Sequence, residues 1–213
     1  MNQPKYRTNS LLYLPCFTLL LLLFLGSCQQ KETLPVLGRR TVNEQGDTLH
    51  HTIGNYHLVN QEGRQVTPGT FKDKIYVADF FFTSCPTICP TMKTQMLRVH
   101  QKFIDHPEFA ILSHSIDPEH DSVAVLKEFA ENLGIENDGK WHFVTGDQSE
   151  IYRLGQTDYM VTALADQSAP GGFIHSGAFI LVDKNKHIRG VYDGTIAEDV
   201  DKLMEDIGLL LTE

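Results

Sequence analysis

The chain has 213 residues, of which 41% are hydrophobic, and its 27 acidic and 18 basic residues give a formal net charge of −9 at pH 7. This acidic balance argues against a nucleic-acid-binding protein and against a polybasic membrane-binding surface. The chain contains no internal repeat and no long low-complexity tract, and its length suffices for one domain with a substantial core.

Residues 1–27 have the pattern of a lipoprotein signal peptide. Lys5 and Arg7 precede an apolar run from Leu11 to Leu25, and small residues lead from this run to Cys28. The pattern predicts that Cys28 is lipidated and becomes the new N-terminus; an uncleaved anchor is the alternative. Both place a membrane-anchored domain in the bacterial cell envelope, facing the periplasm or the exterior. Cleavage removes two basic residues and no acidic one from the totals above, which leaves a net charge of −11.

The segment that follows, residues 28–52, is polar and poor in aromatic residues. We expect it to be the lipidated N-terminus and a tether, in which His50 and His51 are solvated. Residues 53–213 are expected to form the domain. Once Cys28 is lipidated, this domain keeps only two cysteines, and a single close pair in an exported domain indicates redox or metal chemistry rather than a disulfide framework.

Beyond the tether, the chain alternates between strand and helix patterns. Lys74 to Phe82 has the continuous apolar character of a buried central strand, and apolar residues recur at helical spacing after Pro90. In chain order we predict a hairpin at 56–66, a strand at 74–82, a helix at 90–104 and a strand at 109–116. A helix then begins at a cap, Asp121 or Ser122, and stops at Gly134. The remaining elements are a strand at 142–145, a helix from Asp147 or Ser149 to Leu154, strands at 177–183 and 187–192, and a helix at 196–210.

This order favours an α/β fold of thioredoxin-like type. It comprises a central mixed sheet flanked by helices, with an N-terminal hairpin and a C-terminal hairpin plus helix. Met92, Met96 and Trp141 are expected to belong to the core, because thioethers one helical turn apart more often pack than bind metal.

The sequence Cys85-Pro86-Thr87-Ile88-Cys89-Pro90 stands at the junction between the predicted central strand and the helix that follows. Side chains four residues apart can share one face of the first helical turn. Two thiolates placed in this way can close a disulfide or hold one soft metal ion. The cysteine pair alone leaves these two uses open.

A third ligand would have to come from the ten histidines. For most of them a surface or hydrogen-bonded role is the ordinary interpretation. His175 differs, because it follows the glycine-rich stretch at 168–172 and directly precedes a predicted strand. In a thioredoxin-like sheet, the loop entering that strand lies against the N-terminus of the helix that carries the cysteines, and a Gly-Gly approach would allow the histidine to move.

Three spaced motifs resemble the Sco/SenC copper chaperones: residues 82–90, residues 115–118 with Asp121, and His175-Ser176 before residues 179–183. The resemblance spans about residues 53–210. It implies a thioredoxin-like fold in which Cys85, Cys89 and His175 bind one copper ion, Cu(I) or Cu(II), per domain. It also implies a role in assembling the dinuclear copper centre of cytochrome c oxidase, by donating copper or by reducing the target's cysteines.

The partners implied by the resemblance are the copper-bearing subunit of cytochrome c oxidase, other copper chaperones and thioredoxin-like reductants. Two positions depart from the family's pattern: Thr87 and Ile174 stand where the family often has acidic residues. Groups next to metal ligands change the affinity and reactivity of the bound metal. We therefore expect Thr87 and Ile174 to affect copper affinity, the preferred oxidation state of the copper and the choice of partner. Asp117 is a candidate for a place behind the site, with a turn or helix-cap role as the alternative.

The ligand chemistry suits copper. Two thiolates and an imidazole favour Cu(I), and imidazole also serves Cu(II), whereas zinc would require a fourth ligand. The principal alternative is a thiol–disulfide oxidoreductase or redox sensor that uses Cys85 and Cys89, although such proteins usually separate their cysteines by two residues rather than three. A peroxiredoxin is disfavoured, because no arginine stands near the cysteine motif. We therefore expect a metallochaperone rather than an enzyme.

Overall fold

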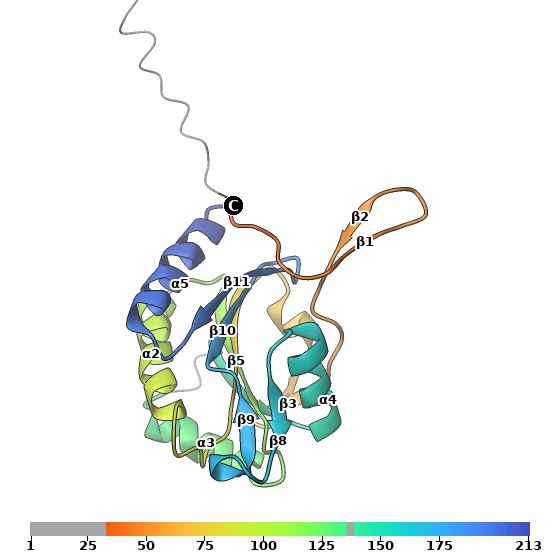
Figure 1. The fold of residues 1–213 in the computed structure, drawn as a ribbon. Coiled ribbons are helices and arrows are strands. Elements are labelled where there is room, and N and C mark those ends of the chain that lie inside the picture. The colour runs from red at the N-terminus through yellow and green to blue at the C-terminus, as the bar shows by residue number, and fades with distance from the viewer. Residues whose placement is uncertain (1–32, 136–138) are drawn as a thin grey trace, which may run out of the picture. The chain divides into compact units, whose positions relative to one another are not determined.

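The structure, a computed structural model, describes residues 33–135 and 139–213 (Figure 1). Residues 33–213 form one compact unit. Its helices are α2 (Cys89–Phe103), α3 (Val123–Asn132), α4 (Gln148–Arg153) and α5 (Ala197–Leu210). Its strands are β1 (Arg40–Val42), β2 (Thr48–His50), β3 (Leu58–Asn60), β4 (Gln65–Val66), β5 (Ile75–Phe81), β6 (Phe109–Ser115), β7 (Trp141–Thr145), β8 (Ala163–Ala165), β9 (Phe173–His175), β10 (Ala178–Val182) and β11 (Ile188–Asp193).

A seven-stranded mixed sheet with the order β11-β10-β5-β6-β7-β3-β4 forms the centre of the fold. Strands β5, β6 and β7 are parallel, and the helices α2 and α3 make the crossovers that parallel strands require. The β3–β4 hairpin extends one side of the sheet and the β10–β11 hairpin the other, all through antiparallel pairs. The predicted α/β class and the two hairpins are confirmed.

Strand β5 is buried along its whole length because both faces of the sheet are covered. Its alternate residues face two separate clusters: Ile75, Val77 and Phe81 join the first, and Tyr76 and Phe80 join the second. Helices α2 and α5 lie side by side on the first face, while α4 lies on the opposite face (Figure 1). The strand therefore leads from the packed core directly into the partly exposed cysteine loop.

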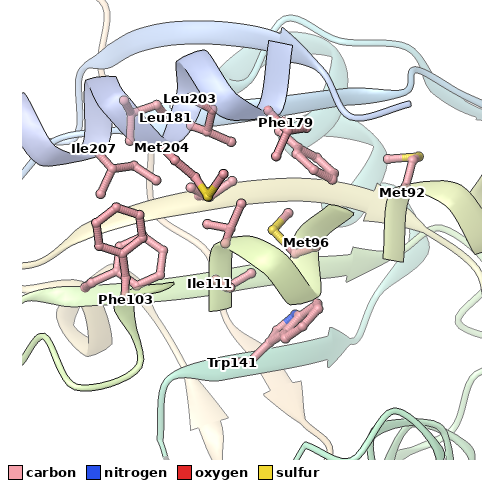
Figure 2. Close-up of a cluster of buried hydrophobic side chains, with 14 of the residues drawn as sticks. Met92, Met96, Phe103, Ile111, Trp141, Phe179, Leu181, Leu203, Met204 and Ile207 are labelled. Carbon is pink, nitrogen blue, oxygen red and sulfur yellow. The ribbon is translucent and has the colours of Figure 1, made fainter. Parts of the chain in front are cut away.

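Figure 2 shows the first cluster, in which side chains of α2 and α5 meet on one face of the sheet. Met92 and Met96 are 2% and 1% exposed, and Trp141 is 2% exposed, as expected for core residues. Their thioethers and indole are packed among Phe179, Leu203 and other apolar side chains. The prediction that the two methionines serve packing is confirmed.

The structure decides between the helix caps that the sequence left open. Of the two candidate caps for α3, Ser122 is the one used: its hydroxyl accepts a hydrogen bond from the Val125 amide at 3.4 Å. Asp147 caps α4 by accepting from the Glu150 amide at 3.0 Å. Because Ser122 caps α3, the carboxylate of Asp121 can accept hydrogen bonds from other segments.

Residues 33–52 belong to the compact unit, although the sequence assigned them to the tether. The Leu37 amide donates to the Ile188 carbonyl at 2.8 Å, and the Arg189 guanidinium donates to the Leu34 carbonyl at 2.6 Å. His51, expected to be solvated, places Nε2 2.6 Å from the Asp158 carbonyl oxygen. The unit begins at Thr33 rather than at residue 53, because a few apolar residues in an otherwise polar segment pack onto the domain.

The predicted signal peptide and the predicted lipidation site, Cys28, lie outside the described residues. Within the described parts of the chain, no helix has the length and apolar character that spanning a membrane would require.

Candidate metal centre

The cysteines occupy the loop between β5 and α2 and the first residue of α2. Cys89 begins the helix and is buried, with Pro90 at the following position, where its missing N–H breaks no helical bond. Cys85 lies in the loop rather than on the helix, half-buried, and its amide donates to the Phe82 carbonyl at 3.2 Å. Both are free thiols. The two sulfurs thus come from different local structures, which differs from the expected shared helical face.

His175 is brought to the cysteines by a small hairpin that the sequence did not predict. The hairpin pairs β8 with β9, with Ala163 opposite His175, and is separate from the main sheet. Its strands have only three residues each, which is too short for a periodic pattern. The turn before β9 contains Gly171 at a φ of 80°, where an added Cβ would lie 2.8 Å from the Phe82 ring. A glycine there lets the turn close against Phe82.

The structure brings the three predicted ligands together. His175 Nε2 lies 3.2 Å from Cys89 Sγ and 3.8 Å from Cys85 Sγ. The three donor atoms all lie within 4.8 Å of one another. The Phe82 ring packs edge-on against the imidazole, with 5.8 Å between ring centroids. A single ion can therefore contact both sulfurs and the ring nitrogen after small side-chain adjustments.

The imidazole is oriented and protonated as a metal ligand requires. His175 Nδ1 lies 3.2 Å from the Ser176 carbonyl oxygen, which can only accept, so Nδ1 carries the proton. The Nε2 lone pair then faces the sulfurs. Burial lowers the pKa of His175, so the ring is neutral at pH 7.

The two thiols differ in acidity. Burial raises the pKa of Cys89, and its hydrogen bond with Cys85 adds to the effect. Burial also opposes ionisation of Cys85, but hydrogen bonds from the Cys89 side chain and from the Thr87 and Cys89 amides outweigh it and lower the Cys85 pKa. The Thr87 hydroxyl lies 3.7 Å from Cys85 Sγ. Cys85 is therefore the first thiol to ionise and the more accessible nucleophile.

A cavity of about 190 Å³ borders Cys85 and His175 on the side away from the core. Apolar side chains make most of its lining, among them Ile88, Phe173 and Ile174. Ile174 is 39% exposed and stands at the rim. A partner that approaches Cys85 and His175 through this cavity therefore meets an uncharged surface.

Asp117 has the turn role that the sequence left open for it, and Asp121 contacts the cysteine loop. The backbone of Asp117 forms local hydrogen bonds at the end of β6: its amide donates to the Ser115 hydroxyl at 3.2 Å, and its carbonyl accepts from the amides of His120 and Asp121. Asp121 is fully buried, and its carboxylate accepts from the Thr83 amide at 3.0 Å and from the Ser115 hydroxyl at 2.5 Å. Asp121 therefore anchors the residue that starts the cysteine loop, and the sequence had assigned it only a capping role.

A protein-family model described as SCO1/SenC matches residues 44–211. The chain belongs to the SCO1/SenC family. The SCO1 protein homolog of Bacillus subtilis (strain 168) is 31% identical to it over 163 residues, which cover 76% of this chain and 83% of the homolog.

Two solved structures of SCO1/SenC proteins have the same fold. A SCO1/SenC family lipoprotein from Bacillus anthracis str. Ames aligns with a TM-score of 0.68 and 26% identity, over 76% of this chain and 95% of that one. BsSco, a member of the Sco family of cytochrome c oxidase assembly proteins, aligns with a TM-score of 0.62 and 29% identity, over 74% and 93% of the two chains. The thioredoxin-like architecture expected from the order of elements is confirmed.

The residues present in this SCO1/SenC chain fit copper. Two free thiols and a neutral imidazole form a soft three-donor set, for which Cu(I) is the preferred ion and which Cu(II) also accepts. The donor set and the family together identify Cys85, Cys89 and His175 as a copper-binding site.

Proposed function

We propose that the protein is a membrane-anchored copper chaperone of the cell envelope that serves the dinuclear copper site of cytochrome c oxidase. The observation that carries the proposal is the convergence of Cys85, Cys89 and His175 beside an open apolar cavity. The description of BsSco as a cytochrome c oxidase assembly protein supports the client, and the B. anthracis relative's description as a lipoprotein supports lipidation at Cys28.

Copper donation would proceed by ligand exchange at the exposed side of the site. A partner thiol approaches past Ile174, loses its proton and binds the copper in place of the Cys85 sulfur, which takes up a proton. A second partner thiol replaces Cys89 in the same way. The bond from copper to His175 Nε2 breaks last, as a further ligand of the partner replaces it. Two copper–sulfur bonds form as two break, and no net proton is released.

The same cysteines can instead reduce a disulfide in the partner. The Cys85 thiolate attacks one partner sulfur, the partner's S–S bond breaks and a mixed disulfide forms. Cys89 then loses its proton and attacks the Cys85 sulfur, which closes the Cys85–Cys89 disulfide. The partner leaves with two electrons and two protons, one proton from Cys89 and one from water. The accessible, more acidic Cys85 and the buried Cys89 favour this order.

A reconstitution with two arms tests both activities. Full-length protein in detergent, carrying one equivalent of copper, is mixed with the reduced, metal-free copper-bearing subunit, and formation of the dinuclear centre is followed by its absorption. Metal-free, reduced protein is mixed separately with the oxidised subunit, and new partner thiols are counted. We expect His175→Ala to stop copper donation and to leave thiol exchange active, while Cys85→Ser stops both. If the wild-type protein acts in neither arm, the proposal is wrong.

A thiol–disulfide oxidoreductase of broader specificity is the second candidate, favoured by the unequal acidity of the two thiols. Turnover of unrelated disulfide substrates at rates similar to the oxidase subunit, unchanged in His175→Ala, would favour it. Lipidation is tested separately by incorporation of labelled fatty acid, which we expect to be lost in Cys28→Ala.

A further inference from the structure

Lys93 places a positive charge on the helix that carries the sulfur ligand Cys89. It follows Cys89 by four positions on α2, so the two side chains lie on the same face of the helix. Its Nζ atom lies 4.0 Å from the ring centroid of Phe81 and 3.7 Å from that of Phe129. The two aromatic faces hold the ammonium in place, about one helical turn along α2 from Cys89.

The carboxylates nearest to this charge are bound by other groups. Asp79, on β5, accepts from the Ser113 hydroxyl at 2.5 Å, and Asp121 accepts from Thr83 and Ser115. Among the described residues, no carboxylate oxygen comes within the 4.0 Å of an ion pair with Lys93 Nζ. Its charge is therefore not cancelled by a direct ion pair.

Lys93 is protonated at neutral pH. Burial lowers its pKa to about 8, and the nearby Cys89 and Asp79 oppose that shift. The positive charge lies one helical turn from Cys89 on the same face of α2, where it attracts a thiolate and repels a proton on His175. The ammonium thus interacts electrostatically with the ligands themselves. Thr87 and Ile174, at the rim of the cavity beside Cys85, are uncharged, so they do not offset the positive charge of Lys93.

We propose that Lys93 determines the copper oxidation state that the site prefers, by stabilising Cu(I) over Cu(II). The inference rests on the copper-chaperone function proposed above. Two thiolates, a neutral imidazole and Cu(I) carry a net charge of −1, whereas the same ligands with Cu(II) are neutral. A fixed positive charge stabilises the more negative form. Reduction adds one electron to the copper, and no bond to a protein ligand forms or breaks.

The expected size of the effect follows from Coulomb's law. At an effective dielectric constant of about 20, two unit charges roughly 10 Å apart interact strongly enough to change an equilibrium constant by about tenfold. For a one-electron couple, a tenfold change corresponds to about 59 mV in reduction potential.

The test compares charge variants of the full-length protein in detergent. Cu(I) affinity is measured by competition with bicinchoninate and Cu(II) affinity by competition with nitrilotriacetate, and the potential is measured against redox mediators. In Lys93→Met, which keeps the apolar stem, the ratio of Cu(I) to Cu(II) affinity should fall about tenfold. Lys93→Arg should restore the wild-type ratio. Lys93→Gln provides an uncharged variant with a polar head group in case the methionine variant does not fold.

Lys102 offers a matched control on the same helix. Its Nζ lies 5.5 Å from the centroid of the Phe103 ring, and Lys102 stands between three and four turns beyond Cys89. Lys102→Met removes the same charge far from the copper and should leave the ratio unchanged. An unchanged ratio in Lys93→Met and Lys93→Gln, or an equal change in Lys102→Met, would overturn the proposal while leaving copper binding intact. Failure of the wild-type protein to bind copper would instead refute the proposed function.

Discussion

His175 Nε2 lies 3.2 Å from Cys89 Sγ, although 86 positions separate the two residues in the chain. Cys89 is the first residue of α2, and His175 is the last residue of the short strand β9. The contact depends on the β8–β9 hairpin and on the close packing of Gly171 against Phe82. The site is therefore assembled from two independently positioned segments, and each can be altered separately.

Removal of the imidazole should weaken copper binding unequally. We expect His175→Ala to reduce Cu(II) affinity by roughly 100-fold or more and Cu(I) affinity by less, because the two remaining thiolates are soft ligands. Competition titrations of both ions measure the difference. His57→Ala is the control, because His57 is exposed and the hydrogen bond it makes to Glu150 comes from its backbone amide. Equal losses for both ions would show that His175 serves the fold rather than the metal.

Copper affinity should rise with pH around neutrality. The raised pKa of Cys89 means that binding must displace its proton, whereas Cys85, with a lowered pKa, releases less than one. The lowered pKa of His175 keeps the imidazole neutral, so it adds no proton. We therefore expect about one to two protons released per copper near pH 7. Calorimetry in buffers of different ionisation enthalpy counts them, and a value near zero would contradict a dithiolate site.

Asp79 should make the protein less stable as pH rises. Burial raises its pKa to about 6 from an ordinary 3.8, so the folded state binds more protons than the unfolded state between these values. Its stabilising contribution is complete below about pH 4 and is lost as pH rises through 6. Asp79→Asn, which can still accept from Ser113, should flatten this dependence and raise stability at pH 7 by about 2 kcal/mol. Urea unfolding of both proteins from pH 4 to 7 measures the difference.

An unchanged slope in Asp79→Asn would show that another group causes the pH dependence. The exposed Asp147 has its pKa lowered by hydrogen bonds from Ser149 and Glu150, so its effect has the opposite sign. Asp147→Asn is therefore a control that should not reproduce the effect of Asp79→Asn.

Loss of the Asp121 carboxylate should disturb the cysteine loop. In Asp121→Ala the Thr83 amide and the Ser115 hydroxyl lose a buried acceptor, which we expect to cost about 2 to 4 kcal/mol of unfolding free energy. Copper affinity should fall as well, because Thr83 precedes Cys85 by two positions. Asp121→Asn, which keeps one oxygen acceptor, should lose less of both. Asp117→Ala should leave copper affinity nearly unchanged; a larger loss there than in Asp121→Ala would reverse the assignment of the two roles.

Features that depend on local pattern could be predicted from the amino-acid sequence alone. The apolar run before the cysteines predicted the buried strand β5, and helical spacing predicted that Met92 and Met96 pack in the core. The spacing of Cys85 and Cys89 indicated a redox or metal pair, and the motif around His175 indicated the third ligand. These predictions succeeded because periodicity and short motifs are properties of neighbouring residues.

Features that depend on contacts between distant segments are seen only in the folded structure. Tertiary packing placed Asp121, rather than Asp117, against the cysteine loop, and it enclosed Lys93 between Phe81 and Phe129 on the helix that Cys89 begins. It also joined the segment 33–52 to the domain through isolated contacts such as that between Arg189 and Leu34. Each such contact joins one or two residues of each segment, so it leaves no periodic signal in the sequence.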